Sequence, residues 1–169
     1  MELTLSIIKP DAVKRGLTGE INTLIEKNKM RIVAQKMLHL SLLDAKGFYF
    51  VHKERAFFND LCEYMTSGPI VVQVLMGKNV VSNYRNLMGA TNPTNADDGT
   101  IRKKYGLSVE ENSVHGSDSK ENSEIEINFF FSKMTTLLNG LLFWTGNFPI
   151  VRALKTAEEA GMTCLLYTS

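Results

Sequence analysis

Cysteine, tryptophan and proline are scarce in this chain of 169 residues, which contains two, one and four of them. The two cysteines, Cys62 and Cys164, do not have the spacing of a metal site or of a disulfide framework. A formal net charge of +1 supports no long-range attraction to nucleic acid. These scarcities argue against a disulfide scaffold, a cysteine-bound metal and a nucleic-acid partner.

A long apolar run is also missing. Residues 137–151 are rich in Leu, Phe, Trp and Ile, but glycine, asparagine and proline interrupt them, and a span of the bilayer needs about 20 apolar residues. The first residues enter a strand pattern without a basic and apolar leader. We therefore expect a reduced, cytoplasmic protein without a membrane segment.

The apolar residues follow the periods of short strands and helices, in a composition that is 44% hydrophobic and 22% charged, as in a globular domain. Leu3, Leu5 and Ile7 alternate with polar residues, which predicts a strand that ends before Pro10. Further strands are expected at residues 31–40, 70–75 and 125–131. Helices are expected from Thr18, whose side chain could cap the first turn, over residues 44–65 in two pieces, and from residue 79.

Residues 112–118 read Asn-Ser-Val-His-Gly-Ser-Asp and place His115 among small and polar residues. Gly116 allows a close backbone approach, and Ser117 and Asp118 could turn the chain by bonding to nearby amides. A neutral imidazole is a nucleophile near pH 7. This heptad alone fits a loop histidine in a turn equally well.

Other polar residues have both a functional and an ordinary interpretation. Arg85 and Arg102 could meet a polyphosphate as two guanidiniums, although a helical arginine usually covers apolar surface. The neighbours Phe57 and Phe58 would by default lie in the core, but one exposed ring could stack on a nucleobase. Glu126 could reach back to His115, or lie on the surface of a strand.

A series of motifs along the chain resembles the nucleoside diphosphate kinase family. The motifs, in the family's order, are Ile-Lys-Pro-Asp-Ala-Val at 8–13, Phe-Tyr-Phe-Val-His at 48–52, Glu-Arg-Ala-Phe-Phe at 54–58, Met-Thr-Ser-Gly-Pro at 65–69, Leu-Met-Gly-Ala-Thr-Asn-Pro at 87–93, Gly-Thr-Ile-Arg at 99–102 and the heptad at 112–118. The resemblance implies a domain over residues 1–131. Residues 132–169 match nothing in the family and form a divergent tail of unknown role.

The resemblance also implies fold, activity and partners. The fold would be α/β (α+β), a ferredoxin-like sandwich with helices packed on a four-stranded antiparallel sheet, which periodicity alone does not select. The activity would be transfer of the γ-phosphate of a nucleoside triphosphate, mainly ATP, to a nucleoside diphosphate such as GDP. It would be a ping-pong reaction through a phosphohistidine at His115, it would need Mg²⁺, and the family forms homo-oligomers (tetramers or hexamers).

The family's site residues carry over onto matching positions of this sequence. Those that match phosphate contacts are Lys9, Arg85, Thr91 and Arg102. Lys9 and Asn112 match the groups that hold a ribose hydroxyl, and Phe57 matches the ring that stacks on the base. Tyr49 and Glu126 match positions beside the histidine, and Ser117 matches the serine near the leaving oxygen. Ala56 departs from the family's usual proline, which could loosen the stacking loop.

Two other functions remain open from the sequence. A catalytically silent nucleotide-binding scaffold would bind nucleotide without forming phosphohistidine, and a nucleic-acid module would use the basic run of residues 102–104. The tail could pack on the domain or on another subunit, or part of it could be foreign to the natural coding sequence. Limited proteolysis would separate these two hypotheses for the tail.

Overall fold

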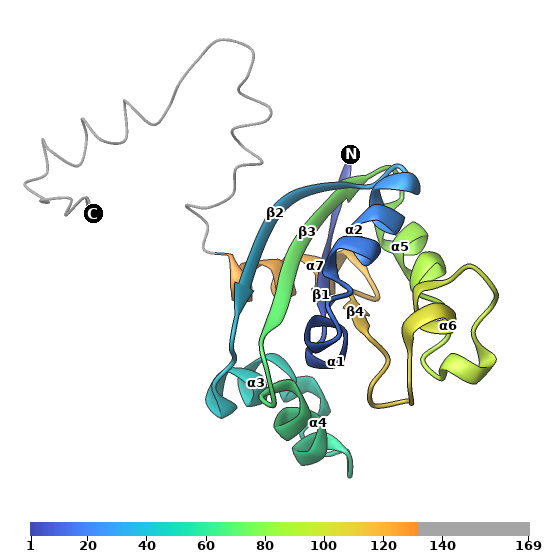
Figure 1. Cartoon of the computed structure of the whole chain (residues 1–169). Helices are drawn as coiled ribbons and strands as arrows, with labels where there is room; N and C mark the ends of the chain where they lie inside the picture. Colours follow the sequence, from blue (N-terminus) through green and yellow to red (C-terminus); the bar gives the residue numbers. More distant parts are fainter. Residues whose placement is uncertain (132–169) are drawn as a thin grey trace, which may run out of the picture. The chain divides into compact units, whose positions relative to one another are not determined.

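The computed structural model describes residues 1–131. The divergent tail of residues 132–169, where the sequence also predicts a helix over 152–160, lies outside them. The described part contains a four-stranded antiparallel sheet in the order β2-β3-β1-β4, with helices packed on it (Figure 1). The strands are β1 (Glu2–Ile8), β2 (Arg31–Leu38), β3 (Ile70–Gly77) and β4 (Val114–Gly116). This architecture confirms the predicted fold class.

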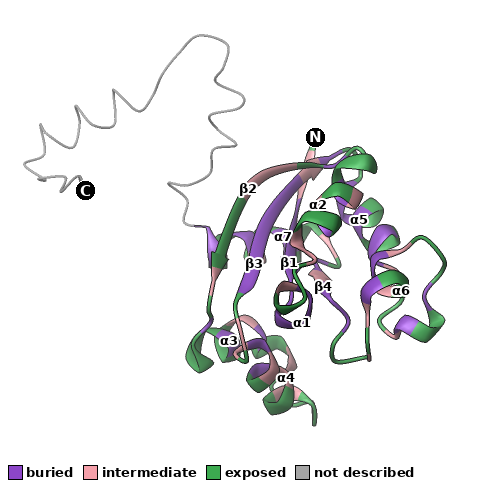
Figure 2. Ribbon diagram, viewed as in Figure 1, coloured by how far each residue is buried: buried purple, intermediate pink, exposed green. Residues whose placement is uncertain are grey.

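The central strands owe their position to their apolar sequences. β3 is buried along almost its whole length (Figure 2), as expected for a continuous apolar run covered on both faces. β1 lies beside it and pairs on its other edge with β4, where Ile7 faces both Val72 and His115. This register places His115 beside the end of β1, close to the point where the chain reaches Lys9.

The helices are α1 (Pro10–Lys14), α2 (Thr18–Lys27), α3 (Leu42–Phe48), α4 (Phe58–Met65), α5 (Val80–Met88), α6 (Ile101–Tyr105) and α7 (Lys120–Phe130), with 3₁₀ turns η1 (Phe50–His52) and η2 (Pro93–Asn95). The expected break within residues 44–65 is confirmed between α3 and α4. The predicted cap at Thr18 is wrong, because Leu17 is the N-cap of α2 and no side chain caps that helix. Helix α1, which has Pro10 in its first turn, was not predicted.

The expected strand over residues 125–131 is wrong, because this segment belongs to α7. Ser119 caps the helix by accepting a hydrogen bond from the Asn122 amide. The buried residues are Ser123, Ile127 and Phe130, at helical spacing. Ile125 and Phe129, which produced the alternating pattern, remain 67% and 44% exposed. Exposed apolar residues of this helix therefore produced an alternating pattern that wrongly indicated a strand.

Residues of β1, β3, β4, α2, α5 and α6 form one apolar core on a face of the sheet. Tyr84 of α5 is fully buried there, and its hydroxyl lies 2.7 Å from Ser6 Oγ. Burial raises the pKa of the Tyr84 phenol to about 12, which its bond to Ser6 partly opposes. The Tyr84 ring is thus fixed by helix α5 at one end and by Ser6 at the other, and it lies directly against Gly116 of β4.

We expect Gly116→Ala to destabilise the fold by about 1–3 kcal/mol, the range for an overpacked core site. A Cβ at residue 116 would lie 2.7 Å from two ring atoms of Tyr84 and 3.0 Å from Met88 Sδ, and the tethered ring has no room to move. Denaturant unfolding of the wild type and the variant measures the difference. Gly19→Ala is the matched control, because nothing lies within 4 Å of its added Cβ and a helical glycine gains stability on this change. Equal stabilities of Gly116→Ala and the wild type would contradict the expectation.

Candidate active site

His115 lies in the middle of β4 rather than in a loop before a strand, so its side chain projects from a hydrogen-bonded backbone. The close approach expected at Gly116 exists, and its partner is the ring of Tyr84. The side chains of Ser117 and Asp118 do not bond to nearby backbone amides, as the prediction of a turn required. Ser117 Oγ accepts from the amide of Leu5 at 3.3 Å, and Asp118 accepts from the side chain of Asn122 at 2.6 Å.

A carboxylate from α7 reaches the imidazole across eleven residues of sequence. Glu126 Oε1 lies 3.1 Å from His115 Nε2, and Ser117 Oγ donates to Glu126 Oε2 at 2.6 Å. A carboxylate can only accept hydrogen bonds, so in the neutral imidazole this contact places the proton on Nε2 and the lone pair on Nδ1. The predicted proximity of Glu126 is therefore observed, although the residue comes from a helix.

Two aromatic rings of α3 and its C-cap flank the histidine. The ring centroids of Phe48 and Tyr49 lie 5.6 and 6.2 Å from that of His115, both edge-on. The Tyr49 hydroxyl is buried and has no hydrogen-bond partner among residues 1–131. Burial raises the pKa of this phenol, with smaller contributions from Glu126 and Cys62, so the group remains a hydrogen-bond donor beside the imidazole.

Lys9 emerges from the end of β1 into buried surroundings. Its ammonium donates to Asn112 Oδ1 at 2.7 Å and to the Glu110 carbonyl at 3.4 Å. Burial, and then the positive charge of Arg102, lower the pKa of Lys9 from its usual 10.5 to about 8, while Asp11 and Glu110 raise it. Asn112 also donates from Nδ2 to the Thr91 and Val109 carbonyls, so this side chain is held on both sides.

Arg102 turns inward from α6, and its two terminal nitrogens donate to the carbonyls of Gly89 (3.0 Å) and Val114 (2.9 Å). Its Nε is buried and has no partner within the described residues. Burial lowers the pKa of this guanidinium, as does the charge of Arg85, while Tyr84 raises it. Arg85 and Thr91 are exposed. The site thus brings cationic side chains from two helices and the end of β1 to one end of the sheet.

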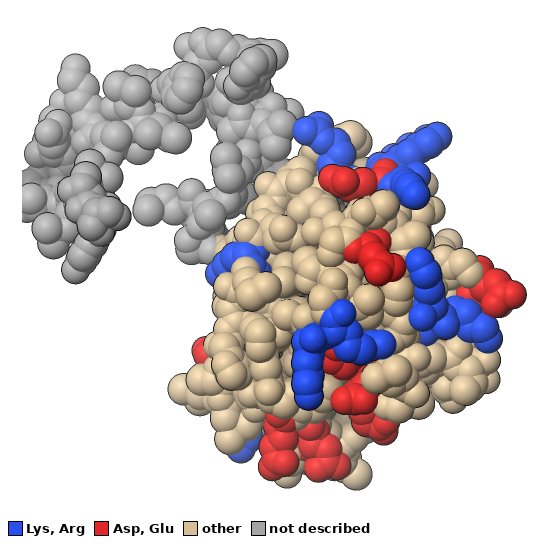
Figure 3. Space-filling model, in the orientation of Figure 1, with Lys and Arg blue, Asp and Glu red and all other residues tan. Residues whose placement is uncertain are grey.

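The basic run of residues 102–104 is not a continuous cationic surface. Arg102 faces inward, and Lys104 lies 3.6 Å from Glu20. On the face in Figure 3, basic and acidic side chains are interspersed. The basic run is thus divided between an inward-facing arginine and a lysine beside a carboxylate.

Of the two neighbouring phenylalanines, Phe57 is 51% exposed. Its ring centroid lies 5.8 Å from that of His52, at a tilt of 53°. Phe58 begins α4 and is half-buried. The expectation that one ring of the pair is exposed holds, and Phe57 is the ring that a base could reach.

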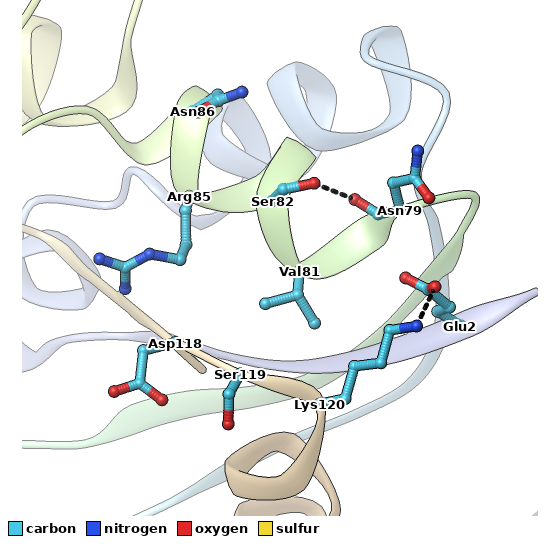
Figure 4. A pocket seen from close by; sticks show the side chains of 9 residues that line it. All are labelled: Glu2, Asn79, Val81, Ser82, Arg85, Asn86, Asp118, Ser119 and Lys120. Atoms are coloured by element: carbon cyan, nitrogen blue, oxygen red, sulfur yellow. Dashed lines mark hydrogen bonds and ion pairs between the residues drawn. The ribbon is translucent and has the colours of Figure 1, made fainter.

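A shallow polar pocket of about 490 Å³ lies beside this site, between α5 and the start of α7 (Figure 4). Arg85 and Asp118 line it, and Lys120 pairs with Glu2 across it at 2.7 Å. His115 is not among its lining residues. The pocket is therefore a neighbour of the histidine site and does not contain it.

No group of three or more His, Cys, Asp or Glu side chains in residues 1–131 could hold a metal ion. None of the helices in the described part is long and apolar enough to cross a membrane.

A sequence model of the family described as nucleoside diphosphate kinase matches residues 2–136. The nucleoside diphosphate kinase of Phenylobacterium zucineum is 61% identical over 132 residues, which are 78% of this chain and 95% of that protein. That of Rhizorhabdus wittichii is 59% identical over 130 residues, 77% of this chain and 93% of the relative. The chain belongs to the nucleoside diphosphate kinase family.

Solved structures agree with this assignment. The nucleoside diphosphate kinase of Aquifex aeolicus superposes with a TM-score of 0.78 at 38% identity, covering 79% of this chain and 97% of that one. The enzyme of Encephalitozoon cuniculi gives 0.77 at 38% identity, covering 80% and 92%. Membership of this family makes the chain a phosphotransferase whose substrates are nucleotides.

The sequence interpretation missed three residues that the structure places at the site. Phe48 packs edge-on against His115, and Asp11 and Ser113, which follow Lys9 and Asn112 closely in the chain, form a buried hydrogen bond. Both Asp11 and Ser113 lie within motifs that had been recognised, but nothing in a linear sequence indicates that two residues 102 positions apart are in contact.

The lowered pKa of Lys9 leads us to expect that kcat/KM falls above an inflection near pH 8. The free enzyme loses the Lys9 proton as the pH rises through about 8, and with it a charge that attracts phosphate. Bound nucleotide would hold the proton, so the inflection in kcat should lie at higher pH. Rate profiles from about pH 6 to about pH 10 measure both. In Lys9→Arg, whose guanidinium stays charged, the inflection should disappear. Its persistence there would show that another group titrates.

Proposed function

We propose that the chain transfers the γ-phosphoryl group of a nucleoside triphosphate, mainly ATP, to a nucleoside diphosphate through a phosphohistidine on His115. The observation that carries this proposal is the contact of Glu126 with His115 Nε2 at 3.1 Å, which leaves the Nδ1 lone pair available. Nδ1 attacks the γ-phosphorus, the bond to the β–γ bridging oxygen breaks, and the nucleoside diphosphate leaves. An oxygen of the second diphosphate then attacks the phosphohistidine and regenerates the free imidazole.

Charge stabilisation comes from the cations around the histidine. Phosphoryl transfer spreads negative charge over the phosphoryl oxygens, and catalysis depends mainly on positioning and electrostatics. Lys9, Arg85 and Arg102 supply positive charge and Thr91 a hydroxyl. Ser117, whose hydroxyl donates to Glu126 in this structure, would lie beside the leaving oxygen. The Tyr49 hydroxyl, which has no partner among residues 1–131, would donate a hydrogen bond to the phosphoryl group or to the groups beside His115.

Other residues would bind the ribose and the base of the nucleotide. In this proposal Lys9 and Asn112, joined at 2.7 Å, bind a ribose hydroxyl. Phe57 presents its exposed ring to the base, and stacking accepts any nucleobase because each has a π-face. Ala56 stands where the family resemblance places a proline, and the loss of the proline ring would give the segment before Phe57 more backbone freedom.

Mg²⁺ would accompany the nucleotide and neutralise oxygens of its β- and γ-phosphates. Residues 1–131 contain no group of three or more His, Cys, Asp or Glu side chains that could hold the ion, and in this proposal the nucleotide phosphates supply most of its ligands. The protein's own contribution is the set of cations and hydroxyls described above. No protein side chain is proposed as a direct metal ligand.

We further propose that residues 1–131 form the catalytic domain, that the enzyme is cytoplasmic, and that it assembles as a tetramer or hexamer. The family match, which ends at residue 136, supports a domain of about this length. Sedimentation analysis distinguishes the two assemblies. The role of residues 132–169 would be tested by limited proteolysis, where trimming to the domain with full activity would exclude a packing role.

The proposal is tested by incubating the protein with γ-labelled ATP and Mg²⁺ and then adding GDP. We expect an acid-labile label on the protein that moves to GTP. Nucleotide binding without any label on the protein would contradict the proposal and favour the catalytically silent scaffold. Steeply salt-dependent DNA binding would instead favour the nucleic-acid alternative.

A further inference from the structure

Two residues before His115, the backbone makes a tight turn of an uncommon kind. The Val114 amide donates to the Asn112 carbonyl at 2.8 Å, and Ser113 between them has φ +69°. An i to i+2 hydrogen bond around a residue with positive φ is a γ-turn, and this form is rare and strained. A non-glycine residue keeps such a conformation only where the surroundings enforce it, and such residues gather at functional sites.

The surroundings of Ser113 enforce the turn through a buried clamp. Ser113 Oγ donates to Asp11 Oδ2 at 3.1 Å and accepts from Arg15 Nη2 at 3.1 Å. Arg15 pairs with the same carboxylate oxygen at 2.7 Å, and the Tyr64 hydroxyl donates to Asp11 Oδ1 at 2.5 Å. The Asp11 and Ser113 side chains are almost completely buried. This set of Asp11, Arg15, Tyr64 and Ser113 is called the Asp11 clamp below.

Groups of the proposed active site are connected to both ends of the turn, by hydrogen bonds or through the chain. On one side, Asn112 bonds the Lys9 ammonium at 2.7 Å, and the Lys9 amide donates to the Ser113 carbonyl at 2.9 Å. On the other side, the Val114 carbonyl accepts from Arg102, and His115 follows immediately. The turn thus sets the separation between the pair Lys9–Asn112 and the imidazole.

We propose that Asp11 and Ser113 are positioning residues for the phosphoryl transfer. Building on the proposed function, the Asp11 clamp keeps the ribose-hydroxyl contacts of Lys9 and Asn112 at the distance from His115 that one nucleotide spans. Neither Asp11 nor Ser113 touches the substrate in this proposal. They act through the γ-turn, and releasing the turn uncouples recognition of the hydroxyl from attack on the phosphate.

The test compares two phosphoryl acceptors, GDP and 2′,3′-dideoxy-GDP, as a ratio of their kcat/KM values. This ratio does not depend on the fraction of folded enzyme, because both values scale equally with it. In the wild type the ratio should favour GDP. In Ser113→Ala it should fall about 10-fold, since misplacing a binding group by a fraction of an ångström has effects of this order. Ser113→Gly also removes the hydroxyl, but glycine accepts positive φ without strain, so this variant is free to keep the fold. Its ratio should fall as well.

Controls and outcomes separate this proposal from the previous one. Thr23→Ala removes an exposed hydroxyl that, among residues 1–131, bonds only the Gly19 carbonyl, and it should leave the ratio unchanged. If the wild type forms phosphohistidine while both Ser113 variants keep its ratio, the positioning role is refuted and the proposed function stands. If the wild type forms no phosphohistidine, both proposals fail. In a double-mutant cycle, Asp11→Asn and Ser113→Gly should change the ratio together no more than the larger single change. Additive effects would refute the shared clamp.

Discussion

His115→Ala is expected to lower the phosphoryl-transfer rate by about 10⁴-fold or more, as removal of a covalent nucleophile does. In the proposed function the other groups bind and orient the nucleotide, but none of them replaces the lone pair of Nδ1. The labelled intermediate should be absent after incubation with γ-labelled ATP, while nucleotide affinity measured by calorimetry should stay within about 10-fold of the wild type.

His39→Ala is the matched control for this variant. His39 is exposed, and within the described part of the chain its ring forms a hydrogen bond only with the Thr66 carbonyl. Its loss should therefore leave the rate unchanged. A labelled intermediate that survives in His115→Ala would place the nucleophile elsewhere.

Glu126→Gln is expected to lower the rate of His115 phosphorylation by about 100-fold. The carboxylate accepts from Nε2 and thereby keeps the lone pair on Nδ1. An amide of the same shape can present its NH₂ group to Nε2, which favours the tautomer with the proton on Nδ1 and blocks attack. The corresponding tautomer error in a serine protease costs about 10⁴-fold, and the smaller value here allows for amide rotamers that still accept from Nε2.

Single-turnover labelling of the enzyme measures this step directly. Glu124→Gln on the same helix makes the same chemical change at an exposed position and should have no effect. The two variants should have similar stabilities, because the amide oxygen introduced by Glu126→Gln could still accept from Ser117. A Glu126→Gln enzyme that is labelled at the wild-type rate would show that Glu126 does not control the tautomer.

The sequence alone determined the family, the nature of the chemistry and most of the sheet. Motifs made of neighbouring residues survive in a linear sequence, and the apolar runs of β1 and β3 are long enough to be identified by their period. His115 was singled out in this way, from a heptad of neighbouring residues. The break between α3 and α4 was predicted from local signals for the same reason.

Only the tertiary structure decided which face of each element is buried and which distant residues are in contact. The last segment is a helix because Ser123, Ile127 and Phe130 pack inward, whereas exposed apolar residues on the same helix had suggested a strand. The Asp11 clamp joins residues 102 positions apart, and the pKa of Lys9 depends on burial produced by several segments together. Desolvation and packing depend on the whole assembled environment of a residue, so neither can be derived from its neighbours in sequence.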